Sequence, residues 1–86
     1  MRVSNSHRQA VTTKYFGPTN SRDGRVKATA QAGSVTITWD DALDVADNHA
    51  AAAAALAKKY GWDKHSKRMI GGALPGGEGY CFVFEG

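Results

Sequence analysis

The sequence predicts an α+β domain in which one alanine-rich helix packs on one face of an antiparallel, four- or five-stranded sheet. Three observations predict it: two adjacent segments alternate between polar and apolar residues, six consecutive alanines favour a helix, and a glycine-rich turn separates two apolar segments near the C-terminus. A chain of 86 residues suits one domain with a small core. We expect this domain to span residues 11–86, in the order strand, strand, strand, helix, strand, strand, after a flexible basic N-terminus at residues 1–10.

The first three strands are expected before the helix. Residues 11–16 are rich in β-branched and aromatic residues and are followed by Gly17-Pro18, which ends a strand. Residues 17–24, GPTNSRDG, are a loop by composition. Residues 25–30 and 34–39 then alternate strictly, which turns Val35, Ile37 and Trp39 to the core side and leaves one wet face, as in a half-buried hairpin.

The register expected for this hairpin places Ala30 opposite Val35 across the four-residue loop QAGS. Small residues would then face large ones on the buried side. On the wet face, Arg25 would lie opposite Asp40 in an exposed ion pair, which would make Arg25 less free to contact a phosphate.

The helix is expected within residues 40–62, DDALDVADNHAAAAAALAKKYGW. Asp44 or Asp47 can cap its start, because a side-chain oxygen there accepts from a free backbone N–H group. Lysines in the last turn complement the helix dipole. Gly61 is expected to end the helix in a left-handed conformation, with Trp62 folding back onto Leu56 or Ala57.

The C-terminal stretch 71-GGALPGGEGYCFVFEG-86 resembles a phosphate-binding loop only in part. Gly71 and Gly76 have the spacing that opens a Walker loop, but Gly77 and Glu78 stand where lysine and a hydroxyl residue are required. An aromatic strand follows instead of a helix that would aim amide groups at a phosphate. Pro75-Gly76 is typical of a type II turn, so we predict a structural hairpin.

Neither an enzyme nor a metal protein is expected from the remaining reactive residues. Cys81 could pair with His7, His49 or His65 as nucleophile and base, but it lies in mid-strand, where a free cysteine is usually a small core residue. Asp40, Asp41, Asp44 and Asp47, with His49 close by, could suggest a divalent metal. Their spacing suits helix capping better, so we expect no metal and no cofactor.

The single cysteine excludes an internal disulfide and favours a reduced, cytoplasmic setting. No segment has the apolar length of a membrane span, and the N-terminus lacks the apolar region of a signal peptide.

Charge is unevenly distributed along the chain. Residues 1–39 carry six lysines and arginines against Asp23 alone, a net charge of +5, whereas residues 40–86 carry five against seven acids, a net charge of −2. The candidate partner- or nucleic-acid-binding residues are Lys14, Arg22, Arg25 and Lys27. A second basic region comprises Lys58, Lys59, Lys64, Lys67 and Arg68. Single-strand binders add stacking aromatics to such cations, and we expect none on this face because Trp39 turns inward.

The segments TKYFGPTNSRDGRVKATA, HAAAAAALAKKYGW and GGALPGGEGYCFVF resemble short proteins of unassigned function encoded by bacterial plasmids and prophages, over residues 12–84. The resemblance implies a mobile-element setting, in which small proteins often act by binding and some inhibit host defence complexes such as CRISPR effectors. The basic N-terminal half argues against DNA mimicry, which needs an acidic surface.

Two functional hypotheses follow. The first is a non-enzymatic protein that binds a macromolecular partner stoichiometrically, such as a host defence nucleoprotein complex, in an anti-CRISPR-like manner. The alternative is a direct nucleic-acid-binding protein that uses the basic sheet face. A steep loss of affinity with salt would distinguish phosphate contacts from a mainly apolar protein interface.

Overall fold

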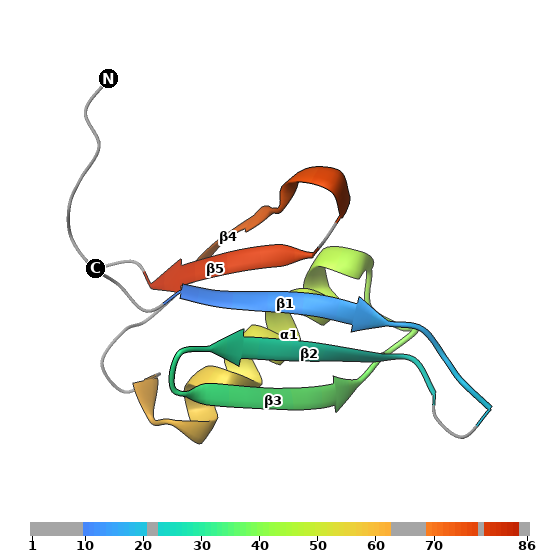
Figure 1. Ribbon diagram of the computed structural model, residues 1–86, viewed down its shortest axis with the longest axis horizontal. Helices are drawn as coiled ribbons and strands as arrows, with labels where there is room; N and C mark the ends of the chain where they lie inside the picture. Colours follow the sequence, from blue (N-terminus) through green and yellow to red (C-terminus); the bar gives the residue numbers. More distant parts are fainter. Residues whose placement is uncertain (1–9, 21–22, 63–68, 78, 85–86) are drawn as a thin grey trace.

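The computed structural model describes residues 10–20, 23–62, 69–77 and 79–84, and the expected N-terminal segment therefore lies outside the described residues except for Ala10. Five strands pair antiparallel in the spatial order β3-β2-β1-β5-β4 (Figure 1). The elements are β1 (Ala10–Phe16), β2 (Arg25–Ala30), β3 (Gly33–Thr38), α1 (Val45–Lys59), β4 (Met69–Ala73), a short 3-10 turn η2 (Pro75–Gly77) and β5 (Tyr80–Phe84). The predicted α+β class and element order are confirmed.

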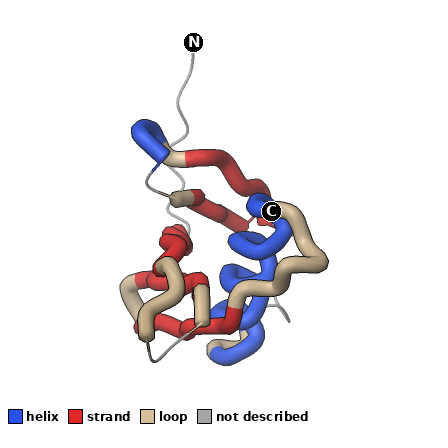
Figure 2. The backbone as a smooth tube through the Cα atoms, turned by 90° about the vertical axis from the view of Figure 1, so that its right-hand side faces the viewer, coloured by secondary structure: helices blue, strands red, loops and turns tan. Residues whose placement is uncertain are grey.

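The fold has two layers, because α1 crosses one face of the sheet, and no described helix covers the other face, which we call the open face (Figure 2). The core lies between them and is built from Val11, Val26, Ala28, Ala52, Ala53, Leu56 and Phe82. Ala52 and Ala53 are fully buried against the sheet, so small side chains let the helix lie close to the strands. Leu56 is the largest fully buried side chain of the helix.

The β2–β3 hairpin pairs two residues away from the expected register. Ala30 lies opposite Gly33, not Val35, and Arg25 lies opposite Thr38, not Asp40. The expected register and the expected Arg25–Asp40 pair are therefore wrong, and the connection is the two-residue turn at 31–32. Because the shift is even, it exchanges no side chains between the faces, and Val35 and Ile37 still pack against the core.

Both ends of α1 follow the expected capping chemistry. The Asp44 side chain accepts a 2.8 Å hydrogen bond from the Asp47 N–H group, which satisfies a free donor of the first turn. Gly61 follows the helix with φ of 72°, which confirms the left-handed residue. The Trp62 ring packs against the core and stacks on Tyr60 at 5.2 Å between centroids.

The C-terminal end of α1 is tied to the β2–β3 turn. The Tyr60 hydroxyl donates to the Ala32 carbonyl oxygen at 3.1 Å, and the Lys59 ammonium donates to the Ser34 carbonyl oxygen, also at 3.1 Å. These bonds fix the helix along the hairpin.

The glycine-rich stretch forms the turn between β4 and β5, as predicted. Gly76 has φ of 74° and ψ of 13°, the values of the third position of a type II turn. The Leu74 N–H group donates to the Gly79 carbonyl oxygen at 2.8 Å and closes the connection.

A buried asparagine holds the connection between β3 and α1. Asn48 is 1% exposed, and its Oδ1 atom accepts a 2.8 Å hydrogen bond from the Asp40 N–H group. Its Nδ2 atom lies 2.9, 3.1 and 3.3 Å from the carbonyl oxygens of Asp40, Asp44 and Leu43. This network sets the path of residues 40–44 and thereby the positions of Trp39 and the start of α1.

Candidate functional site

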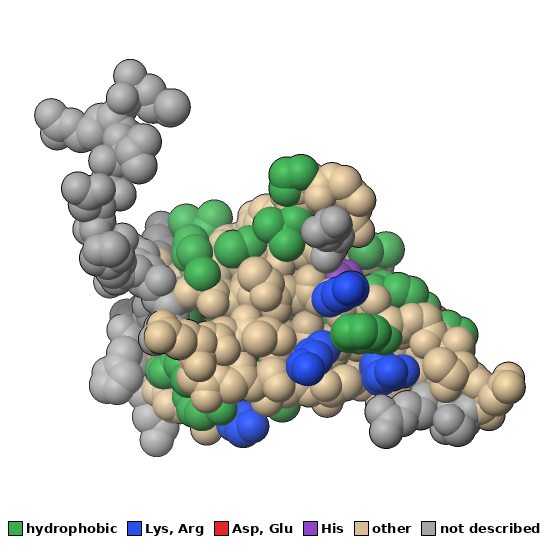
Figure 3. All heavy atoms as spheres, viewed as in Figure 1, with side chains coloured by type: hydrophobic (Ala, Val, Ile, Leu, Met, Phe, Trp, Pro, Cys, Tyr) green, Lys and Arg blue, Asp and Glu red, His purple; other side chains and the backbone are tan. Residues whose placement is uncertain are grey.

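The open face of the sheet carries a concentrated group of cations. Lys14 on β1 lies directly opposite Lys27 on β2, and Arg25 lies opposite Phe16 nearer the end of the two strands. Figure 3 looks onto this face and shows lysine and arginine side chains around a hydrophobic side chain over β1 and β2. We call Lys14, Phe16, Arg25 and Lys27 the cationic surface.

Three of the four predicted cations thus come together, and Arg22 lies outside the described residues. Exposed threonines surround them on the same face: Thr12, Thr29, Thr36 and Thr38.

The cationic surface also contains an aromatic ring, which corrects the expectation that it has no stacking residue. The Lys14 Nζ atom lies 5.6 Å and the Arg25 Cζ atom 5.3 Å from the centroid of Phe16, so both make cation–π contacts with it. Trp39 does turn inward, as expected. The spacing of Phe16 two residues after Lys14 was the signal for this arrangement, because residues two apart share one face of a strand.

The cationic surface holds a pair of like charges that favours an anionic ligand and, beside it, a buried donor without a partner among the described residues. Like charges directly opposite each other on neighbouring strands destabilise a sheet, and Lys14 and Lys27 are such a pair. The Nη1 atom of Arg25 is buried and has no hydrogen-bond partner among the described residues. A buried donor without a partner costs about 1–3 kcal/mol, and more when charged. An anion on this face would relieve the repulsion between Lys14 and Lys27.

The second basic region is only partly described. Lys58 and Lys59 lie exposed in the last turn of α1, on the covered side of the sheet, and Lys59 is bonded to Ser34. Lys64, Lys67 and Arg68 lie outside the described residues.

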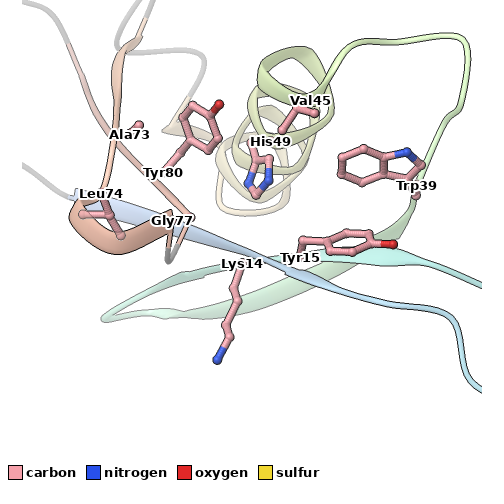
Figure 4. A pocket seen from close by; sticks show the side chains of 10 residues that line it. Lys14, Tyr15, Trp39, Val45, His49, Ala73, Leu74, Gly77 and Tyr80 are labelled. Carbon is pink, nitrogen blue, oxygen red and sulfur yellow. The ribbon is translucent and has the colours of Figure 1, made fainter.

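A second candidate site is a half-open hollow on the helix side of the sheet, with a volume of about 590 Å³ (Figure 4). It lies between the C-terminal part of β1, the start of α1 and the β4–β5 turn. Its lining includes Lys14, Tyr15, Trp39, Val45, His49 and Tyr80. Sequence reasoning missed this hollow, because its walls come from segments far apart in the chain.

His49 projects from α1 into the hollow and is held by β1 (Figure 4). Its Nδ1 atom lies 2.7 Å from the Thr13 hydroxyl oxygen, and its ring centroid lies 4.5 Å from that of Tyr80 and 6.2 Å from that of Trp39. Burial lowers the pKa of His49 from its ordinary value of 6.5, because desolvation disfavours the imidazolium form. The ring is therefore neutral near pH 7.

Two of the four aspartates considered for metal binding accept hydrogen bonds from the backbone. Asp44 caps α1, and the Oδ1 atom of Asp40 accepts from the Ala42 N–H group at 2.9 Å. Within residues 10–20, 23–62, 69–77 and 79–84, no three histidine, cysteine, aspartate or glutamate side chains gather as a metal site would require.

Cys81 does not meet His49, one of the three histidines considered above as its possible base. It is half-buried on β5, opposite Thr12 and Gly72, and points away from the helix side, where Phe82 is buried. The interpretation of Cys81 as a core residue is therefore wrong, and His49 lies on the other side of the sheet. His7 and His65 lie outside the described residues.

Comparison of the chain with protein-family models, with curated proteins and with solved structures found no match in any of the three. Among the described helices, none has the length and apolar character needed to cross a bilayer.

Proposed function

We propose that this chain is a non-enzymatic nucleic-acid-binding protein that holds a single strand against the open face of its sheet. The observation that carries the proposal is the arrangement of Lys14, Arg25 and Lys27 around the ring of Phe16. Single-strand binders combine cations that follow the phosphates with aromatic rings on which bases stack. The cationic surface has both components within a few residues.

A flat sheet face suits a single strand better than a duplex. Base edges of a duplex are read by an element that enters a groove, such as a helix or a two-stranded ribbon. The one long helix among the described residues is packed against the sheet, and the cations lie on the opposite, flat face. A single strand can lie across such a face with its bases turned toward Phe16 and its phosphates near the cations.

The wider expectation of a host defence nucleoprotein as the partner, in the cytoplasm of a cell that carries the mobile element, stays a prediction. A nucleoprotein would present RNA or DNA phosphates to this same surface, so the direct test uses nucleic acid alone.

The test is fluorescence anisotropy of a labelled dT oligonucleotide of about 12 nucleotides, titrated with the protein at several salt concentrations. Three phosphate contacts predict a log–log salt slope of about −2, which is a loss of about 20-fold in affinity between about 50 and 200 mM salt. Binding that is absent at the lower salt, or equal at both, would refute the proposal.

Phe16→Ala separates the two components of the surface. Loss of one stacking ring should weaken binding by about 1–3 kcal/mol and leave the salt slope unchanged, because phenylalanine carries no charge. Thermal unfolding of the variant must first show that it is folded, since Phe16 is half-buried.

A further inference from the structure

The hollow at His49 and the cationic surface meet at Lys14. The pairing of β1 with β5 ends at Thr13 opposite Tyr80, so that, among the described residues, no strand pairs with the stretch from Lys14 to Phe16 on this side, and we call it the free edge of β1. Lys14 belongs to the open face and also borders the hollow on the other side of that edge. His49 lines the same hollow from α1 (Figure 4).

The volume and the aromatic lining of the hollow suit a flat aromatic ligand. Its volume of about 590 Å³ lies within the range of small-molecule sites. Tyr15 and Trp39 form one wall, with ring centroids 4.8 Å apart and the planes at 66°. His49 and Tyr80 form another (Figure 4). Aromatic walls of this kind stack on planar rings.

His49 adds one polar group to these walls. Its Nδ1 atom is engaged by Thr13, and within the described part of the chain its Nε2 atom has no hydrogen-bond partner. A neutral imidazole with one nitrogen engaged keeps the other as a single donor or acceptor, according to the tautomer. A heteroaromatic ring with a polar edge would satisfy this atom, whereas a purely hydrocarbon ring would not.

We propose that the hollow is a nucleobase subsite, with the phosphate of the same nucleotide held at Lys14. A strand lying on the cationic surface would pass one base over the free edge of β1, so that this base stacks among the aromatic walls and bonds to His49 Nε2. The inference rests on the proposed function, because it assigns that function a second place of contact. It adds base recognition to a surface that otherwise offers cations for phosphates and the half-buried ring of Phe16.

A mononucleotide tests the subsite without a strand. In Trp62→Phe protein, Trp39 is the only tryptophan left and lies in the wall of the hollow. AMP should change its fluorescence saturably below about 10 mM, whereas ribose 5-phosphate and inorganic phosphate at equal concentration should not. Amide chemical shifts of Thr13, His49 and Gly79 in the wild-type protein give the same readout independently of the Trp62 substitution. A response to ribose 5-phosphate equal to that of AMP, or no AMP response in either measurement, would overturn the proposal.

Two variants and one control locate the AMP response within the hollow. His49→Asn can keep the bond to Thr13 through its amide, which occupies the place of Nδ1, but has no atom at Nε2, and should weaken AMP binding about fivefold to tenfold. Val45, at the rim and 54% exposed, can be enlarged to phenylalanine to obstruct the hollow. Val45→Phe should abolish the AMP response, and Leu43→Phe, an exposed residue of the preceding loop, should retain it. Equal responses in these two variants would contradict the assignment.

The oligonucleotide assay tests the proposed function, and the AMP assay tests the nucleobase subsite, so that each can fail without the other. A dT oligonucleotide that binds with the expected salt slope, to a protein that does not respond to AMP, would refute the subsite and leave the cationic surface in place. An AMP response without salt-dependent oligonucleotide binding would refute the proposed function.

Discussion

Replacement of Asn48 by alanine should destabilise the fold strongly. Asn48 is polar, but its side chain is buried and hydrogen-bonded to the backbone. The Asn48 side chain accepts one hydrogen bond, from the Asp40 N–H group. Its amide group also has two N–H hydrogens, which it shares among the carbonyl oxygens of Asp40, Leu43 and Asp44. Together with the accepted bond, the side chain therefore makes about three hydrogen bonds. At about 1 kcal/mol for each, the loss is about 3 kcal/mol.

Two effects reduce this figure. Alanine has a higher helix propensity than asparagine, by about 0.5 kcal/mol, and Asp40, Leu43 and Asp44 are exposed enough for water to replace part of the lost bonding. We therefore expect a loss of about 2–2.5 kcal/mol in the free energy of unfolding, which lowers the Tm of a chain of this length by about 8–20 °C.

Differential scanning calorimetry of Asn48→Ala, with Asn20→Ala as the matched control, measures this effect. Asn20 lies exposed in the loop after β1, and its replacement should change stability by less than about 0.5 kcal/mol. If the two variants melted within about 2 °C of each other, the Asn48 network would not hold the β3–α1 connection.

Two further predictions concern pH and the helix end. Because burial lowers the pKa of His49 in the folded state, the unfolded chain binds more protons just below pH 6.5, so stability is full above that pH and falls as the pH drops through it. His49→Asn should remove this dependence between about pH 5 and 7 in thermal unfolding, and an unchanged pH profile would contradict the assignment. Gly61→Val should destabilise by about 1–2 kcal/mol, because Gly61 has φ of 72° while the space around its Cβ position is open, so that only backbone strain contributes. Gly72→Val, in open space without a positive φ, is its control and should be near neutral; equal melting temperatures of the two variants would show the cap assignment to be wrong.

The sequence predicted the faces of the fold but not the register of its hairpin. Alternation of polar and apolar residues specifies which side chains of β2 and β3 face the helix, and those assignments are confirmed. A shift of two residues leaves every side chain on its own face, so the apolar pattern cannot distinguish the expected pairing from the observed one. The turn decides the register, and the observed two-residue turn, without positive φ at Gln31 or Ala32, is shorter than the four-residue loop QAGS that we expected.

The candidate sites were predictable to different degrees. Lys14, Arg25 and Lys27 were identified by their charge alone, and the strand pairing then placed them together. Phe16 could have been added, because its spacing from Lys14 places both on one face. The hollow could not, since the contacts of His49 with Thr13 and Tyr80 depend on how α1 crosses the sheet.

The most direct test of the cationic surface compares two variants of equal charge. Lys14→Ala with Lys27→Ala, and Lys58→Ala with Lys59→Ala, each remove two of the eleven lysines and arginines and lower the net charge from +3 to +1. Oligonucleotide anisotropy across salt should show a slope less steep by about 1.4 in the first double variant and the wild-type slope in the second. Equal changes of the salt slope in both double variants would show that net charge alone causes the effect. A change in the second variant only would show that the strand binds at the end of α1 and not at the cationic surface.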